Sequence, residues 1–449
     1  MEIIIIGAGV VGVSLAKYLS GEGHDVVITD SHAGVIRQLQ ETMDLQALHG
    51  DTTDSEFLRS VGLEKADLVL AVTNSDESNI IITLMARAIN PSARMITRVC
   101  KKQYLNNPGM ADKASIGGVT FFSPDQAAVE MVQDLLLVDQ SFDVAPFEHG
   151  SISVAGFQLG QESVLIGRPL HTIRELTDLG VLLVALDRDG QVNIPNGQTV
   201  LHAADRVYVS TGRKTELSKI IALLGMPPVE HRKIVIAGGG WKGEQVATRL
   251  EKDRVPVFLL EQSLERCQEL ASVLDNVTVL HCDATDPETL KKISQGTSTF
   301  IAMTGHQEVN LVLCLLARQY GALRTIAMMD NEAYVTMAHS LGVNAVVSPK
   351  QAAVGKVLRF LSVGKVLDSA TLLHGKLDAL FMEIQAGSRM VGKPLREIGL
   401  PKTLIVAAAI QQGQMKIPTG NMLLKPGDLA LIITFPGHFQ RVDEFLSGQ

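Results

Sequence analysis

The sequence predicts an α/β protein with two doubly wound parallel sheets, each followed by a small α+β module. Three observations support this prediction. Short apolar runs alternate with amphipathic helical stretches, a glycine turn follows an apolar run at two places, and the whole pattern occurs twice. Strands that alternate with helices of this length are typical of βαβ units, whose strands lie parallel. The duplication therefore predicts two similar halves.

The clearest repeat is a glycine turn followed by an acid. In the first copy Gly7-Ala8-Gly9-Val10-Val11-Gly12 follows an isoleucine run, and Asp30 stands 23 residues after the first glycine. In the second copy Gly238-Gly239-Gly240-Trp241-Lys242-Gly243 follows an apolar run, and Glu261 has the same spacing. A strand, a GxGxxG turn that opens a helix, and an acid about 20 residues later form the dinucleotide-binding fingerprint of Rossmann-like sheets. Two copies in one register predict two nucleotide sites.

The pattern also predicts the order of the elements. In the first copy we expect buried strands at residues 2–6, 25–29, 67–72, 94–99 and 119–122, with amphipathic helices between them. After each sheet the turns Ile194-Pro195-Asn196-Gly197 and Ile417-Pro418-Thr419-Gly420 mark a small β-rich module. Breaks in the pattern then predict four domains, sheet domains alternating with small modules, at 1–138, 143–226, 231–362 and 368–449.

Each residue type in the first turn suits contact with a phosphate. Gly7 permits the tight turn, Gly9 the close approach of a pyrophosphate, and Gly12 the packing of helix against strand. Asp30 would accept hydrogen bonds from the ribose diol of adenosine. Its carboxylate would repel a 2′-phosphate, so the sequence favours NAD over NADP.

Further polar residues follow the predicted strand ends. Asp51 and Asp283 come after the third strand of each copy, where a carboxylate either reaches the adenine edge or only forms an Asx turn. Thr73 and Asn74 follow the fourth strand, on the crevice side where ligands bind, although the segment that starts at Asn74 would also suit a helix N-cap. Arg98 ends the fifth strand, where its guanidinium could bind phosphate or ribose.

The second copy departs from the first. Met328 stands opposite Arg98, so that cation is lost, and Thr304-Gly305 replaces Thr73-Asn74. Lys242 enters the loop beside Trp241, where it either supplies the missing charge or is merely solvated. We therefore expect the two sites to differ in affinity or in preferred nucleotide.

Composition argues against several classes of function. The net charge of −8 and the pI near 5.9 disfavour nucleic-acid binding, including a redox-sensing transcription regulator. The first glycine turn follows Met1 too closely for a signal peptide, and no stretch of about 18 uncharged apolar residues predicts a membrane span. Motifs for catalysis or metal binding are missing as well, so we expect no enzyme; an NAD-dependent oxidoreductase is the alternative.

These features together resemble a known family. A GxGxxG sheet domain with Gly50-Asp51-Thr52-Thr53-Asp54, followed by a module with Gly167-Arg168-Pro169-Leu170, resembles an RCK (regulator of K⁺ conductance) unit, with its RCK_N and RCK_C domains. Two units in tandem over the whole chain resemble the cytosolic regulatory subunits of bacterial Trk potassium-uptake systems.

The resemblance implies further properties. It implies a homotetrameric ring in the cytoplasm, attached peripherally to the inner membrane through a potassium-translocating partner of the Trk or Ktr type. It implies NAD⁺ or NADH at site one, and NAD or ATP/ADP at site two. The residues that it places at site one are Gly7 through Val11, Asp30, Thr73, Asn74 and Arg98. Those at site two are Gly238, Gly240, Lys242, Glu261 and Thr304.

Overall fold

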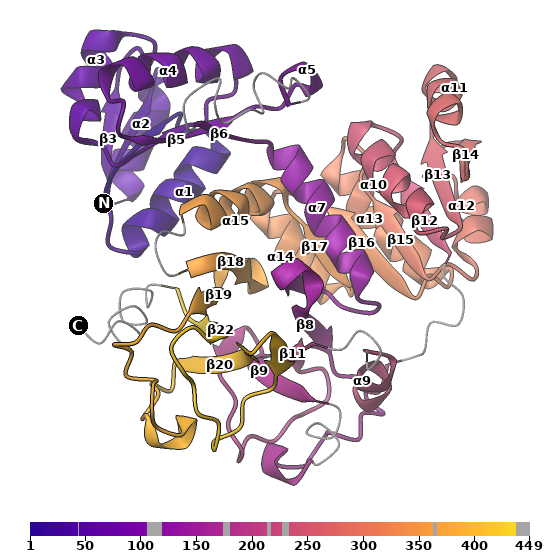
Figure 1. Cartoon of the computed structure of the whole chain (residues 1–449). Helices are drawn as coiled ribbons and strands as arrows, with labels where there is room; N and C mark the ends of the chain where they lie inside the picture. Colours follow the sequence, from indigo (N-terminus) through magenta and orange to yellow (C-terminus); the bar gives the residue numbers. More distant parts are fainter. Residues whose placement is uncertain are drawn as a thin grey trace. The chain divides into compact units, whose positions relative to one another are not determined.

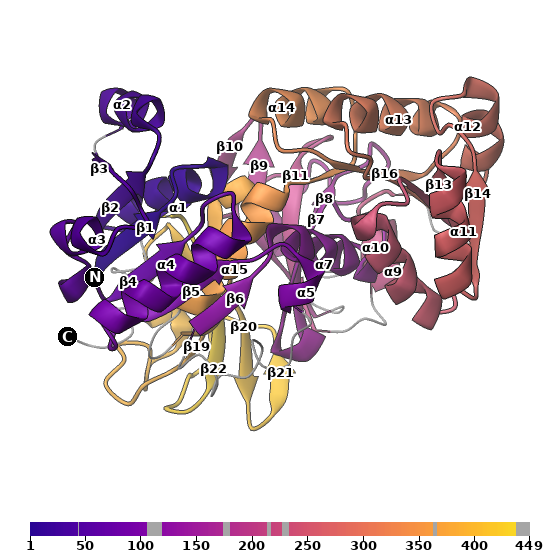
Figure 2. The same ribbon diagram turned by 90° about the horizontal axis from the view of Figure 1, so that it is seen from above.

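The computed structural model describes residues 1–43, 45–105, 119–173, 180–212, 217–226, 233–361 and 366–436 (Figures 1 and 2). It divides into two compact units. One unit joins Met1–Ala127 to Lys350–Val363, and the other joins Ala128–Pro349 to Gly364–Phe435. None of the helices in the described ranges combines the length and the hydropathy that a bilayer-spanning segment requires.

The first sheet has six parallel strands in the order β3-β2-β1-β4-β5-β6. Its strands are β1 (Glu2–Ile6), β2 (Asp25–Asp30), β3 (Gln46–His49), β4 (Leu68–Ala71), β5 (Arg94–Arg98) and β6 (Val119–Phe122). Its helices are α1 (Val10–Gly21), α2 (Ala33–Thr42), α3 (Ser55–Ser60), α4 (Asp76–Ile89) and α5 (Lys102–Leu105), with a 3₁₀ turn η1 (Leu63–Lys65). All five apolar runs form strands. The short edge strand β3 is exposed at both ends, so no apolar run marked it.

Alternating side chains of β1 explain why helices cover both faces of this sheet. Ile5 is buried in a cluster with Leu15 of α1, whereas Ile6 is buried in a separate cluster with Ile82 of α4. Successive strand residues point to opposite faces, so an uninterrupted isoleucine run needs apolar partners on both sides. The doubly wound architecture predicted from the sequence is confirmed.

The second sheet repeats this arrangement in the order β14-β13-β12-β15-β16-β17. Its strands are β12 (Ile234–Ala237), β13 (Val257–Glu261), β14 (Val277–His281), β15 (Thr299–Ala302), β16 (Arg324–Met328) and β17 (Ala345–Val347). The helices are α10 (Trp241–Lys252), α11 (Leu264–Val273), α12 (Pro287–Ser294), α13 (Gln307–Gln319) and α14 (Glu332–Ser340). The two parallel sheets therefore share one topology.

Each small module is a five-stranded antiparallel sheet. The first has the order β10-β9-β11-β8-β7 and the second β18-β19-β22-β20-β21, which is the same order read from the other edge. The first contains β7 (Asp143–Phe147), β8 (Ile152–Gln158), β9 (Val181–Arg188), β10 (Gln191–Asn193) and β11 (Arg206–Thr211), with η2 (Glu148–Gly150), η3 (Leu170–Thr172) and α9 (Leu217–Leu223). The second contains β18 (Val366–Leu372), β19 (Leu377–Glu383), β20 (Leu404–Gln411), β21 (Gln414–Lys416) and β22 (Leu429–Thr434), with η5 (Leu373–Gly375) and η6 (Leu395–Glu397).

Two helices pack on a sheet of the other half of the sequence. Helix α15 (Pro349–Leu361) follows the second sheet, yet its Val357 lies in the core of the first sheet (Figure 1). Helix α7 (Pro124–Leu137) follows the first sheet, and the carbonyl of its Leu135 accepts a hydrogen bond from Arg324 of β16. This exchange was not predicted, because the apolar face of an amphipathic helix does not show which sheet it covers.

Candidate functional site

The first glycine turn has the shape that its sequence predicts. Gly7 follows β1 with φ of 112°, and a Cβ there would lie 2.7 Å from the Thr73 nitrogen. A Cβ on Gly12 would lie 1.9 Å from the Gly7 carbonyl oxygen. Both positions therefore require glycine, because the helix, the turn and the end of β4 approach one another so closely. Gly9 caps α1 without any side-chain hydrogen bond, and a Cβ there would have only the Asn74 amide oxygen nearby, at 3.7 Å.

The acid of the first copy lies against this turn. The Ala8 amide donates to Asp30 Oδ2 at 2.7 Å, and the His32 amide donates to Oδ1 at 2.9 Å. Burial alone would raise the pKa of Asp30, but these amides and the His32 ring outweigh it and lower the pKa below its ordinary value. The carboxylate is therefore ionised beside the loop. Val10 is exposed and Val11 half-buried at the start of α1.

A buried asparagine holds the turn after β4. Asn79 Oδ1 accepts from the Thr73 amide at 2.8 Å and from the Thr73 hydroxyl at 2.6 Å. Its Nδ2 donates to the carbonyls of Thr73 at 3.1 Å and Arg98 at 3.0 Å. Asn79 thus fixes the end of β4 against the end of β5. Its recurrence as Asn310 in the second copy was the signal that could have identified this role.

Arg98 and Asn74 both lie close to the carboxyl ends of β4 and β5. The Arg98 guanidinium donates through Nη1 to the Thr73 carbonyl at 2.6 Å, while its buried Nε has no hydrogen-bond partner. Ser75, rather than Asn74, caps α4, because its hydroxyl accepts from the Ser78 amide at 3.1 Å. No hydrogen bond is recorded for the exposed Asn74 side chain within the described residues. Both groups are therefore suited to bind a ligand that occupies the loop.

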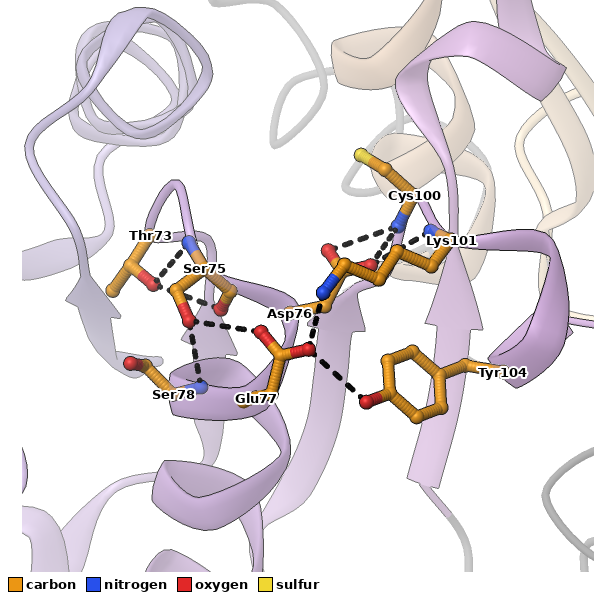
Figure 3. A network of polar contacts seen from close by, with 8 residues as sticks. All are labelled: Thr73, Ser75, Asp76, Glu77, Ser78, Cys100, Lys101 and Tyr104. Atoms are coloured by element: carbon orange, nitrogen blue, oxygen red, sulfur yellow. Dashed lines mark hydrogen bonds and ion pairs between the residues drawn. The ribbon is translucent and has the colours of Figure 1, made fainter. Parts of the chain in front are cut away.

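The N-terminus of α4 is also tied to the segment after β5, as Figure 3 shows. The buried Asp76 carboxylate accepts from the amides of Cys100 and Lys101, the latter at 2.7 Å. Glu77 pairs with the Lys101 ammonium and accepts from the Tyr104 hydroxyl at 3.1 Å. The hydrogen bond from Lys101 is the main reason that the pKa of Glu77 falls to about 2. Sequence reasoning did not identify this network, which fixes one wall of the crevice.

Asp51 and Asp283 form Asx turns. Asp51 Oδ1 accepts from the amide of Thr53 at 2.8 Å and from its hydroxyl at 2.6 Å. Asp283 makes the same pair of contacts with Thr285, at 2.8 and 2.7 Å. The Asx turns alone give both carboxylates a structural role. A contact with adenine remains a prediction.

The second glycine turn repeats the first in detail. Gly238 has φ of 113°, and a Cβ there would lie 2.8 Å from the Met303 carbonyl oxygen. The Gly239 amide donates to Glu261 Oε2 at 2.9 Å, as Ala8 does to Asp30. Gly240 caps α10 without a side-chain hydrogen bond, so Trp241 and Lys242 form the first turn of that helix. The second copy therefore keeps the geometry of the loop and its acid.

The crevice side of the second site is less charged. Asn310 Oδ1 accepts from the Thr304 amide at 2.9 Å, which reproduces the turn made by Asn79. Asn310 Nδ2 donates to the carbonyl of Met328 at 2.8 Å, and Met328 is buried at the position of Arg98. Gln307 replaces Asp76, and its Oε1 accepts from the amides of Asp330 and Asn331. The fold of this turn therefore needs neither Arg98 nor Asp76.

This architecture defines a tandem protein of the RCK class. The TrkA-N domain model matches residues 3–115 and 234–349, and the TrkA-C domain model matches residues 154–225 and 381–447. The chain belongs to the TrkA family, with both domains present twice. The resemblance stated from the sequence and the predicted order of modules are confirmed.

Relatives and solved structures agree with this family. The Trk system potassium uptake protein TrkA of Azorhizobium caulinodans is 29% identical, over 99% of this chain and 98% of that protein. TrkA homolog 1 of Methanosarcina mazei is 30% identical, over 99% of this chain and all of that protein. The GsuK RCK domain covers the whole chain with a TM-score of 0.58 at 20% identity, over 95% of that domain. The relatives are named as potassium uptake proteins, which confirms the expectation that the chain is not an enzyme. The likeness to the GsuK domain shows the fold alone.

Proposed function

We propose that the chain is a nucleotide-sensing regulatory subunit that gates a membrane potassium-translocating partner of the Trk or Ktr type. The observation that carries this proposal is the 2.7 Å hydrogen bond from Ala8 to Asp30, because it sets a ribose-binding acid directly against a phosphate-binding loop. The subunit acts in the cytoplasm as a homotetrameric RCK ring. It attaches to the inner membrane through its partner.

NAD⁺ or NADH is the ligand proposed for site one. The α1 N-terminus, with Gly9 in the capping position, receives the pyrophosphate, and ionised Asp30 receives the ribose diol. Asn74 and Arg98 then contact the part of the dinucleotide that extends past β4. Support comes from the GsuK channel, which has been solved bound to NAD; it covers the whole chain with a TM-score of 0.58 at 19% identity.

Site two takes NAD or a compact adenine nucleotide, ATP or ADP. Gly238, Gly240 and Glu261 repeat the first loop and its acid, so the adenosine half of a nucleotide suits both sites. Thr304 and Met328 offer no cation to the far half of a dinucleotide. The two sites therefore respond to different nucleotides or to different concentrations.

Gating follows from a shift between arrangements of the ring. A nucleotide biases two arrangements only by the difference in its affinity for them. Moving the population from 1:99 to 99:1 takes about 5.5 kcal/mol of such difference. Eight sites in a homotetrameric ring with two sites per subunit share this requirement, so each supplies only about 0.7 kcal/mol. Duplicated sites on every subunit serve this purpose.

A flux measurement tests the proposal. The chain is reconstituted with its potassium-translocating partner in vesicles, and potassium flux is recorded with and without NADH, NAD⁺, ATP or ADP. We expect at least one nucleotide to change the flux, and the Asp30→Ala/Glu261→Ala double variant to lose that response. Equal flux with empty and saturated rings would refute gating.

A further inference from the structure

A charged pair lies beside the second glycine loop and has no counterpart in the first. Arg266, in the first turn of α11, donates through Nη2 to the Glu244 carboxylate of α10 at 2.6 Å. Its Nε donates to the Gly239 carbonyl of the loop at 2.9 Å. Its Nη1 donates to Glu269 of its own helix at 2.7 Å. One guanidinium thus joins the loop to the starts of two helices.

The first copy shows that the loop does not need this pair to fold. Val13 and Val35 occupy the positions of Glu244 and Arg266 there. The turn glycines nevertheless have almost the same φ, 112° at Gly7 and 113° at Gly238. The exchange of two apolar side chains for an ion pair therefore leaves the backbone of the loop unchanged and alters the charge beside it.

The guanidinium lies on the ribose side of the loop. Gly239 donates its amide to Glu261 and accepts at its carbonyl from Arg266, so the presumed ribose acid and the cation flank the same loop residue. In the first copy the cation is instead Arg98, at the end of β5, on the far side of β4. The second copy has therefore moved its cation from the far half of a dinucleotide site to the adenosine half.

The Glu244 carboxylate accepts the hydrogen bond from Arg266 Nη2 that a nucleotide phosphate would otherwise accept. Glu244 lies in the first turn of α10, where the helix dipole attracts anions. Its carboxylate therefore competes with a nucleotide phosphate both for this helix end and for Arg266. A phosphate that replaces Glu244 would accept the charge-assisted hydrogen bond that Nη2 now donates to the carboxylate.

We propose that Arg266 and Glu244 determine the specificity of site two: Arg266 binds the phosphates of a compact adenine nucleotide, and Glu244 weakens that binding by competing for Arg266. This inference rests on the proposed nucleotide function of site two. A mononucleotide ends beside the loop and gains the contact with Arg266. A dinucleotide extends toward Met328, where no cation meets it, so ADP is preferred over NAD⁺.

Calorimetric titrations of ADP and NAD⁺ in an Asp30→Ala background test this assignment, because only site two then reports. We expect Glu244→Gln to raise the ADP affinity about tenfold and Arg266→Gln to lower it about tenfold, with smaller changes for NAD⁺. The gain from Glu244→Gln should be smaller when Arg266 is already replaced by Gln, since part of the effect of Glu244 acts through Arg266. Glu269→Gln removes the exposed partner and serves as the matched control, with a change within about twofold.

The outcomes separate this inference from the function of the site. Unchanged ADP affinity in Arg266→Gln, or a lower affinity in Glu244→Gln, overturns the assignment while site two remains a nucleotide site. No binding of either nucleotide in the Asp30→Ala background, with or without Glu244→Gln, overturns both. Circular dichroism and thermal melting show whether each variant is folded. We expect all of them to fold, because the first loop has the same shape with Val13 and Val35 at these positions.

Discussion

Asn79 and Asn310 hold the turns after β4 and β15 with the same set of four hydrogen bonds. An amide side chain suits this position because it donates and accepts at once, which a carboxylate or an aliphatic chain cannot do. Both residues are buried, and without Asn79 the Thr73 amide and the Arg98 carbonyl would lose these hydrogen bonds. These residues hold the turns in place through their own hydrogen bonds.

Asn79→Ala should lower the free energy of unfolding by about 2–4 kcal/mol, because the Thr73 amide and the Arg98 carbonyl lose their partner. Asn74→Ala is the matched control: this exposed neighbour should change stability by less than about 0.5 kcal/mol yet weaken NAD⁺ binding at site one. Denaturant unfolding and calorimetry measure the two effects. Equal stability losses would contradict the division of roles.

Asp30 makes a prediction about pH. Because the pKa of Asp30 is lowered in the folded protein, the carboxylate stays ionised even at a pH where an ordinary Asp takes up a proton. Its contribution is present above the ordinary pKa and is lost only as the pH falls below about 4. The His32 ring contacts Asp30, so a His32→Gln variant isolates the carboxylate. In that variant, NAD⁺ affinity at site one should be constant between about pH 5 and pH 8. An inflection that Asp30→Asn removes would show that the pKa is not lowered.

At the scale of elements, the exchanged helices α7 and α15 are held in equivalent ways. Arg94 at the start of β5 donates to the Phe360 carbonyl near the end of α15. Arg324 at the start of β16 donates to the Leu135 carbonyl at 2.9 Å, near the end of α7. A cation at a helix C-terminus satisfies its carbonyls and complements its dipole. The two contacts differ in burial, since Arg324 is 1% exposed and Arg94 is exposed.

Arg324→Met should therefore cost about 2–4 kcal/mol of unfolding free energy, because the buried guanidinium contacts with the Leu135 carbonyl and the Ser141 hydroxyl are lost. The same substitution at Arg94 should cost less than about 0.5 kcal/mol. Equilibrium denaturation of both variants gives the comparison. A loss at Arg94 as large as the loss at Arg324 would show that burial does not set the strength of these contacts.

At the scale of the whole molecule, the duplication was visible in the sequence because the constraints on the glycine turns are local. Gly7 and Gly238 need positive φ, and the acids stand at a fixed distance along the chain, so both loops could be predicted. The exchange of α7 and α15 could not be predicted, because the apolar face of a helix does not show which sheet it packs against. The Glu244–Arg266 pair was not predicted either, because it lies outside the fingerprint and the first copy has Val13 and Val35 at these positions.

The central claim is that the chain carries two unequal nucleotide sites, one per loop. A calorimetric titration of NAD⁺ and ADP into wild type, Asp30→Ala and Glu261→Ala tests this claim most directly. We predict two affinities in the wild type. Asp30→Ala should remove the site that prefers NAD⁺, and Glu261→Ala should remove the other. A single affinity that both substitutions weaken equally would contradict the account.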